Sequence, residues 1–330
     1  MGTERCAPVG RFELSERGKA IIALSLLSPV LAELMSGSSP PLEFFNPISF
    51  LFLWGFYGAG VLIAHELWVR WGKGYMRLML LGFAYGIFEE GLAIKSWFDP
   101  GWMDLGALGT YGRIWGINTM WAVWLTVFHS VMSISAPIIV FAAFFPKYRG
   151  KSLLTDREVK KVLCIFMLTT FLSYMGLNPY GPPLLQYFLA GLLMIGILWL
   201  AMNRDMKATF PPLFAPNHPF IYGVSVSVLL FLINTILPKA SVPVIITMTL
   251  DLLVILHFYS QLEHLEDRGR YSQIFGFLSF WALFMGFIYE RLGVLGMSVV
   301  GVVTFLILFK KYMEIQGKPV FLIAKIRRLR

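Results

Sequence analysis

Charged residues are scarce in this chain of 330 residues. Asp, Glu, Lys and Arg make up 14% of it, whereas soluble domains carry about 25%. Hydrophobic residues account for 57% of the chain and aromatic residues for 16%. This balance excludes a disordered chain, a coiled coil and an ordinary water-soluble domain. It predicts an all-α, polytopic helical membrane protein.

Cysteine and the common catalytic motifs are also nearly absent. Cys6 and Cys164 are the two cysteines, too few for a disulfide framework or a zinc ligand set. The sequence contains no GxSxG, HExxH, Walker or dinucleotide-binding motif. We therefore expect no metal and no cofactor, and the hydrolase classes that depend on those motifs are excluded.

Ten long apolar runs are present instead, each close to the ~20 residues that cross a bilayer as a helix. A backbone in lipid must satisfy its own hydrogen bonds, so these runs predict helices. They cover approximately 19–35, 47–68, 75–95, 114–144, 159–176, 184–202, 220–237, 243–260, 272–290 and 294–312. The domain prediction is an N-terminal cytoplasmic segment 1–18, a single transmembrane domain 19–312 and a basic amphipathic tail 313–330.

The positive charges alternate with these runs. If both termini are cytoplasmic, 24 of the 28 basic residues fall on the inner side. The four exceptions are Lys95, Arg113, Lys239 and Arg291. The positive-inside rule therefore predicts both termini in the cytoplasm and a multi-pass protein of the plasma membrane. The net charge of +9 then reflects topology, and no nucleic-acid partner is expected. The tail could also bind anionic inner-leaflet lipids as an interfacial helix, or simply act as a stop-transfer cluster.

The adjacent Glu89 and Glu90 are the most informative charges within the apolar runs. Ionisable groups in lipid are costly and are functional candidates by default. Two carboxylates buried side by side repel, so one would keep a proton near neutral pH. His129 on the next run could polarise a carbonyl or pass a proton, and Asn118 could stabilise an oxyanion. The alternative is a structural cluster whose polar groups satisfy one another between helices.

Further polar residues are predicted in the outer half of the membrane or in the outer loops. The Gly82 and Gly86 pair forms a GxxxG face that would let another helix approach the glutamates closely. A structural role is favoured for Asp251. The candidates for lining a cavity or contacting substrate are Glu33, Glu43, Asn46, Asp99, Asp104, Arg113 and Asp251.

The string AYGIFEEGLAIKSWF, followed by FHS 39 residues after Glu90, resembles the CAAX-prenyl protease and bacteriocin-processing membrane proteins. Glu89 and Glu90 match the paired glutamates of the family motif EExxxR, and His129 matches the histidine of FxxxH. The resemblance implies a metal-independent intramembrane peptidase in which a glutamate and a histidine activate water. The motif arginine is missing here, and Leu125 stands where FxxxH has phenylalanine.

Three functions remain open at this point. The first is a metal-independent intramembrane hydrolase with Glu89 or Glu90 as general base. The second is a proton-coupled secondary transporter with the same glutamates as proton carriers, since Pro29 and Pro137 interrupt their spans as in broken transporter helices. The third is a non-catalytic membrane scaffold subunit whose glutamates pair with a partner helix.

Overall fold

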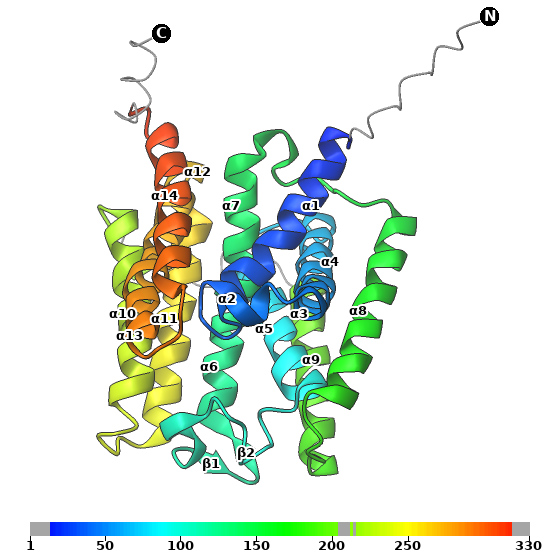
Figure 1. Ribbon diagram of the computed structural model, residues 1–330, viewed down its shortest axis with the longest axis vertical. Helices are drawn as coiled ribbons and strands as arrows, with labels where there is room; N and C mark the ends of the chain where they lie inside the picture. Colours follow the sequence, from blue (N-terminus) through cyan, green and yellow to red (C-terminus); the bar gives the residue numbers. More distant parts are fainter. Residues whose placement is uncertain (1–13, 204–211, 214–215, 319–330) are drawn as a thin grey trace, which may run out of the picture.

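The computed structural model describes residues 14–203, 212–213 and 216–318 (Figure 1). Within these residues the chain is a helical bundle with one two-stranded hairpin. Most of the predicted basic tail, residues 319–330, lies outside the described residues. The all-α prediction is therefore confirmed for the part of the chain that the structure describes.

The bundle consists of α-helices from both halves of the chain, with a few short elements between them. The first half contains α1 (Glu16–Pro29), α2 (Pro41–Phe44), α3 (Pro47–Leu53), α4 (Ala59–Arg70), α5 (Tyr75–Gly86), α6 (Thr119–His129) and α7 (Ala136–Phe144). The second half contains α8 (Asp156–Gly176), α9 (Leu184–Asn203), α10 (Pro219–Ile236), α11 (Val244–His264), α12 (Asp267–Ser279), α13 (Gly286–Arg291) and α14 (Met297–Ile315). The short elements are the 3₁₀ turns η4 (Gly106–Gly109) and η6 (Pro146–Tyr148), and the strands β1 (Arg113–Ile114) and β2 (Ile117–Asn118).

Five segments of π-helix lengthen these helices. They are η1 (Val30–Leu34), η2 (Trp54–Gly58), η3 (Ile87–Ala93), η5 (Ser130–Ser135) and η7 (Phe280–Met285). The segments η2, η5 and η7 each join two α-helices into one continuous run, and η1 and η3 extend α1 and α5. In η1 the Met35 amide donates to the Val30 carbonyl over 2.9 Å, the five-residue spacing of a π turn. Pro29 directly precedes η1 and Pro137 closely follows η5. The two predicted helix interruptions are therefore widened turns, and the helices continue through them.

Each of the ten predicted ranges corresponds to one helical run, but ten membrane crossings are not confirmed. Seven runs are long and apolar enough to cross a membrane. The runs 16–34, 75–93 and 297–315 each carry several charged residues and fall outside that set. The predicted start at 114 was also wrong, because residues 113–118 form the hairpin and the helix begins at Thr119.

Helix starts coincide with residues that cap them. Ser15 accepts a hydrogen bond from the Gly18 amide at the start of α1. Thr155 and Glu158 form a reciprocal capping box at the start of α8, which satisfies two amides that no helical carbonyl reaches. These polar side chains explain why helices begin a few residues before the apolar runs do.

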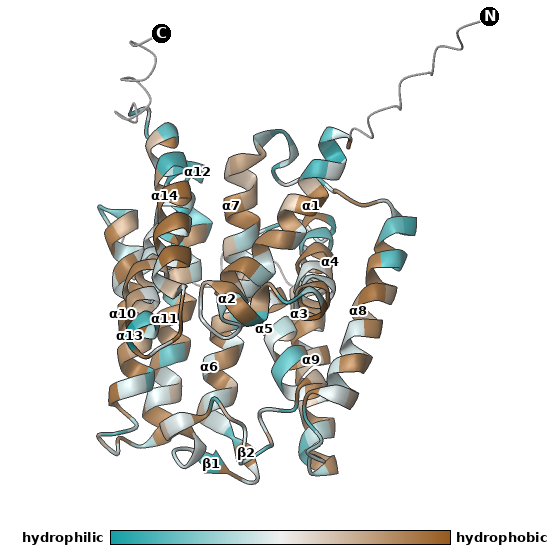
Figure 2. Cartoon of the chain, viewed as in Figure 1, coloured by the Kyte–Doolittle hydropathy of each residue, from teal (hydrophilic) through white to brown (hydrophobic). Residues whose placement is uncertain are grey.

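The helices divide into a buried centre and an apolar rim. The continuous helix Thr119–Phe144 is 89% buried over its most apolar window, whereas α9 is 11% buried. Figure 2 shows hydrophobic residues along most of each helix, with hydrophilic residues gathered near helix ends such as the start of α8. The exposed apolar surfaces of α8 and α9 are suited to lipid contact.

The first and last described helices have their outer ends on the same side of the bundle. Figure 1 shows the start of α1 and the end of α14 both at the top of the bundle, with the β1–β2 hairpin at the bottom. The placement of these two helix ends on one side agrees with the positive-inside count. Which side faces the cytoplasm stays a prediction, and we use "inner" for the side on which α1 starts and α14 ends.

Candidate functional site

Polar side chains from three π segments and from the residue just before a fourth meet in the interior of the bundle. Glu33 comes from η1, Tyr57 from η2, and Glu89 and Glu90 from η3. His129 is the last residue of α6, immediately before η5. All five are buried, and Glu89 has no exposed surface. Widened π turns are less stable than α turns and are common at functional sites, so their convergence marks this cluster as the candidate site.

His129 contacts both adjacent glutamates. Its Nε2 lies 3.1 Å from Glu90 Oε1 and its Nδ1 lies 3.2 Å from Glu89 Oε2. Nδ1 also lies 2.8 Å from the hydroxyl oxygen of Ser133, one turn further along the helix. The structure thus brings together three of the four residues predicted to be catalytic, although their function stays a prediction.

The three carboxylates of the site differ in how they are satisfied. Glu33 accepts hydrogen bonds from the hydroxyls of Tyr57 and Ser39. Glu90 accepts one from the hydroxyl of Ser96 and contacts His129. Neither oxygen of Glu89 accepts a hydrogen bond from the described residues. The nearby Tyr85 hydroxyl also has no hydrogen-bond partner among the described residues, and Tyr57 donates its single hydroxyl proton to Glu33.

Two glycines allow the helix that carries the glutamates to approach the helix that carries His129. A Cβ atom on Gly82 would lie 2.5 Å from the Cα of Ser130. A Cβ atom on Gly86 would lie 3.0 Å from the Cα of Thr126 and 3.2 Å from the Cβ of His129. The GxxxG face therefore packs against the helix that carries His129, so another helix does approach the glutamates closely, as predicted.

Asn118 and Arg113 lie in the outer hairpin and hold the loop next to the site. The Asn118 amide nitrogen donates to the Ser96 carbonyl over 3.1 Å and to the Asp99 carbonyl over 2.9 Å. Arg113 donates to the Asn118 side-chain oxygen and to the Phe98 carbonyl. Asn118 is thus fully bonded within the loop, and the oxyanion role predicted for it has no free donor in this arrangement.

The remaining predicted residues lie apart from the cluster. Glu43 is exposed, and Asn46 is exposed and caps α3. The Asp99 carboxylate accepts from the Gly101 amide in a tight turn. Asp251 accepts two hydrogen bonds from the Asn234 amide between α11 and α10.

An outer cavity of about 480 Å³ approaches the cluster from the side of the hairpin. Trp121 and Phe128 form part of its wall. The Trp121 indole donates to the Ser96 hydroxyl over 3.0 Å, and Ser96 in turn donates to Glu90. Asp104 also lines this cavity, where partial burial raises the pKa of its carboxyl group. Along this chain of contacts, the side chains of Trp121 and Ser96 lie between the cavity and Glu90.

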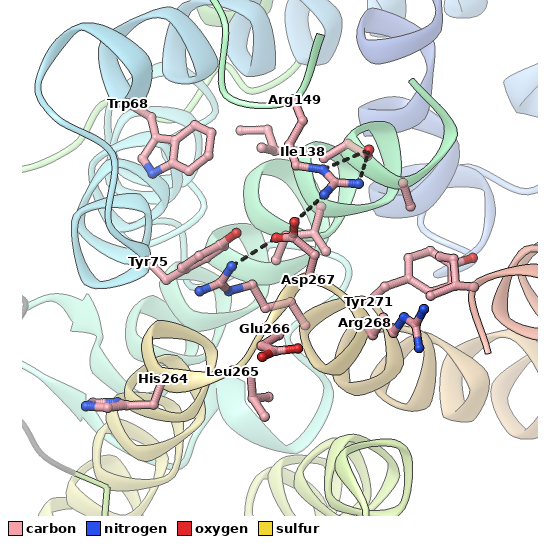
Figure 3. A pocket seen from close by; sticks show the side chains of 15 residues that line it. Trp68, Tyr75, Ile138, Arg149, His264, Leu265, Glu266, Asp267, Arg268 and Tyr271 are labelled. Carbon is pink, nitrogen blue, oxygen red and sulfur yellow. Dashed lines mark hydrogen bonds and ion pairs between the residues drawn. The ribbon is translucent and has the colours of Figure 1, made fainter. Parts of the chain in front are cut away.

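An inner cavity of about 830 Å³ opens at the opposite end of the same helices. Figure 3 shows Arg149 joined to Asp267 at this cavity. Arg270 bonds the same carboxylate at 3.0 Å and its guanidinium lies 4.6 Å from the ring centre of Tyr75. The inner cavity is thus lined by basic, acidic and aromatic side chains.

Two central helices line both cavities. In the helix 119–144, Trp121 and Phe128 face the outer cavity and Ile138 faces the inner one. In the helix 267–291, Tyr289 faces the outer cavity and Tyr271 the inner one. The cluster lies between the two cavities along the first of these helices.

A second polar layer lies between the cluster and the inner cavity. The Tyr259 hydroxyl of α11 lies 2.7 Å from the hydroxyls of both Ser130 and Ser135. Ser28 of α1 donates to the Ser133 carbonyl over 2.6 Å. Polar groups therefore continue through η5 toward the inner side.

Sequence reasoning missed several partners of the cluster. Tyr57, Ser39 and Ser96 hold the glutamates, and Ser133 holds His129. The three serines in HSVMSIS, at residues 129–135, were a usable signal, because hydroxyls are unusual in so apolar a run. Tyr57 gave no such signal within its aromatic-rich surroundings.

Comparison with known proteins identifies a family. A family model described as "Uncharacterized membrane protein family" matches residues 22–325, so the chain belongs to that family and is a multi-pass membrane protein. No curated protein and no solved structure matches. The family match gives no support to the resemblance to CAAX-prenyl proteases. The plasma membrane as location stays a prediction.

Proposed function

We propose that the chain is a secondary transporter in which Glu89, Glu90 and His129 bind the coupling cation. One observation carries the proposal: two cavities at opposite ends of the same two helices flank one buried, ionisable cluster, and no residue of the cluster lines either of them. A transporter needs a central site that each side can reach in turn. The prediction that the coupling ion is a proton stays open here.

The π segments supply positions at which these helices could bend. The helix 119–144 changes from α to π at Ser130, and the helix 267–291 does so at Phe280. Kinks in helices occur at such widened turns and at proline. Bending there would open one cavity toward the cluster and close the other.

Site-specific labelling tests this proposal. In a full-length background with Cys6 and Cys164 replaced by serine, single cysteines are placed in the outer cavity as Ala107→Cys or in the inner cavity as Ala142→Cys. Membrane vesicles are labelled with an impermeant maleimide from each side. Met103→Cys, an exposed loop position, serves as the accessibility control.

The labelling is then repeated after Glu89→Gln. Removing the charge shifts the balance between a state with the outer cavity open to the cluster and a state with the inner cavity open to it. One cavity cysteine is therefore expected to react faster and the other more slowly, each by several-fold. Asp251→Asn, which neutralises a buried carboxylate elsewhere, should leave both rates unchanged. Unchanged rates in Glu89→Gln indicate a fixed scaffold, and a joint rise in both rates indicates loosening; either result refutes the proposal.

Peptide hydrolysis is a second candidate, supported by the Glu89 carboxylate that lies beside His129 without a hydrogen-bond donor. Such a carboxylate could act as a general base toward water. Separate Glu89→Gln and Glu90→Gln variants, assayed on membrane-tethered peptides, test it. Full cleavage by both variants would eliminate this candidate.

A further inference from the structure

We propose that Glu89, Glu90 and His129 form a binding site for a first-row divalent transition-metal ion. Binding itself is argued from the cluster alone. That the ion is also the cation carried between the two cavities rests on the proposed function. The proposal departs from the sequence expectation that the chain holds no metal.

The spacing of the donor atoms fits a metal site. Each of the three residues offers one ligand atom, and these atoms lie within 4.8 Å of one another. His129 Nε2 lies 3.1 Å from Glu90 Oε1. Oxygen and nitrogen ligands about 2.0–2.2 Å from a metal lie about 3 Å apart, so a small rotation of the side chains would place them around one ion.

Ser133 gives the imidazole a defined orientation. Its hydroxyl lies 2.8 Å from His129 Nδ1 and can accept the Nδ1–H proton. That tautomer leaves the lone pair on Nε2, next to Glu90, as the metal ligand. Glu89, whose Oε2 lies 3.2 Å from Nδ1, would reach the same ion only after its side chain rotates toward Nε2. Metal-binding histidines are usually oriented by such a hydrogen bond on their other nitrogen.

The Glu89 carboxylate is the independent sign that a ligand belongs here. It has no exposed surface, and neither oxygen accepts a hydrogen bond of normal geometry from the described residues, although His129 Nδ1 lies 3.2 Å from Oε2 and the hydroxyls of Tyr57 and Tyr85 lie nearby. Buried carboxylates normally accept several hydrogen bonds or bind a cation. By contrast, both oxygens of Glu33 accept hydrogen bonds, which places Glu33 outside the set of ligands.

The charge balance also favours a divalent ion. Glu33, Glu89 and Glu90 lie close together, and no lysine or arginine among the described residues forms an ion pair with them. Lys95, on the same run, instead donates to the Tyr174 and Asn178 carbonyls. Without such a partner, buried carboxylates keep protons or share a cation, and a divalent cation would take the place of those protons.

The donor types narrow the choice of metal. One imidazole nitrogen with carboxylate oxygens suits Mn²⁺, Fe²⁺, Co²⁺ or Zn²⁺. Mg²⁺ prefers oxygen ligands alone, and Cu⁺ prefers sulfur. Cys164 is exposed on α8, a helix that contributes no member of the cluster.

Cobalt binding to the full-length protein in detergent tests the proposal, because the visible absorption of Co²⁺ reports its ligands. After treatment with a chelator, the wild-type protein should bind one Co²⁺ per chain, and Zn²⁺ should displace it. Glu89→Gln and His129→Gln should each weaken binding by at least 100-fold. Ser133→Ala should weaken it by about 10–100-fold through loss of the orienting hydrogen bond.

Two further variants keep the result interpretable. Asp251→Asn removes a buried carboxylate of α11 and should bind Co²⁺ like the wild type. Glu89→Asp keeps an oxygen donor on a shorter side chain, so it should bind more weakly than the wild type and more tightly than Glu89→Gln. Absence of Co²⁺ binding by the folded wild type, or equal binding by Glu89→Gln, Glu89→Asp and wild type, would overturn the proposal.

The two proposals fail separately. If the cavity cysteines respond in opposite directions but no Co²⁺ binds, the transporter stands without a metal. If Co²⁺ binds at the cluster while the cysteines do not respond, the metal site stands and transport falls.

Discussion

Replacement of Gly82 by alanine tests whether the close approach of two helices holds the cluster together. Gly82 of α5 packs against the backbone of Ser130, at the junction of α6 and η5. A Cβ atom there would lie 2.5 Å from the Ser130 Cα, a contact with backbone that no side-chain rotation relieves. The two helices would have to separate.

The size of the effect follows from that distance. Carbon atoms pack at about 3.5–4.0 Å, so the helices must move apart by about 1 Å. Overpacking of this kind costs about 1–3 kcal/mol. The contacts of His129 with Glu89 and Glu90, now 3.2 Å and 3.1 Å, would lengthen with the same movement. The variant should lose stability and weaken the cluster together.

Thermal unfolding of the full chain in detergent, followed by tryptophan fluorescence, measures the change. The midpoint should fall by roughly 2–12 °C, at ~2–4 °C for each kcal/mol. Gly196→Ala on α9 is the matched control, since its Cβ would meet nothing within 4 Å. Alanine there should leave the midpoint unchanged or raise it slightly, because alanine is the better helix former. Equal midpoints for the two variants would refute the packing argument.

Three further predictions concern buried polar contacts. Glu66→Ala removes a carboxylate that accepts a hydrogen bond from the Leu153 amide over 2.6 Å. It should lower the free energy of unfolding by about 1–3 kcal/mol and speed tryptic cleavage of the loop 145–155. Unchanged cleavage would contradict this prediction. Asn118→Ala should free the outer hairpin, seen as faster hydrogen exchange over residues 96–118, while exchange in α9 stays constant. Asn234→Leu leaves Asp251 buried without its donor and should destabilise more than the double variant Asn234→Leu/Asp251→Leu, as measured by thermal unfolding.

The positions of the helices could be predicted because apolar runs of membrane length are a strong signal. Their edges shifted where a polar cap lies before the run, as Thr155 does before α8. The hairpin was missed because RIWGIN reads as part of an apolar run. Its turn depends on Trp115 and Gly116, both with positive φ, a local backbone property that hydropathy does not contain.

The centre of the site could be predicted because charge is rare in this chain. Glu89, Glu90 and His129 stand out against an apolar background, and the structure joins them. Their partners could not be found in the same way, because a tyrosine such as Tyr57 is ordinary in a sequence with 16% aromatic residues. Asn118 could not be separated from the site either, since only the fold shows that carbonyls already occupy its amide.

The π segments make the geometry of the site depend on chain length as well as on residue identity. Each such segment amounts to one extra residue inserted into an α-helix. Deleting one residue between Ile87 and Ala93 would let this stretch close into regular α-helix, and the residues within it, Glu89 and Glu90 among them, would point in new directions because successive α-helical residues are ~100° apart. The same chemical groups would then face different neighbours. A sequence alignment of this family should therefore place its insertions and deletions within helices, and single gaps at η1, η2, η3 or η5 would mark members whose central site differs.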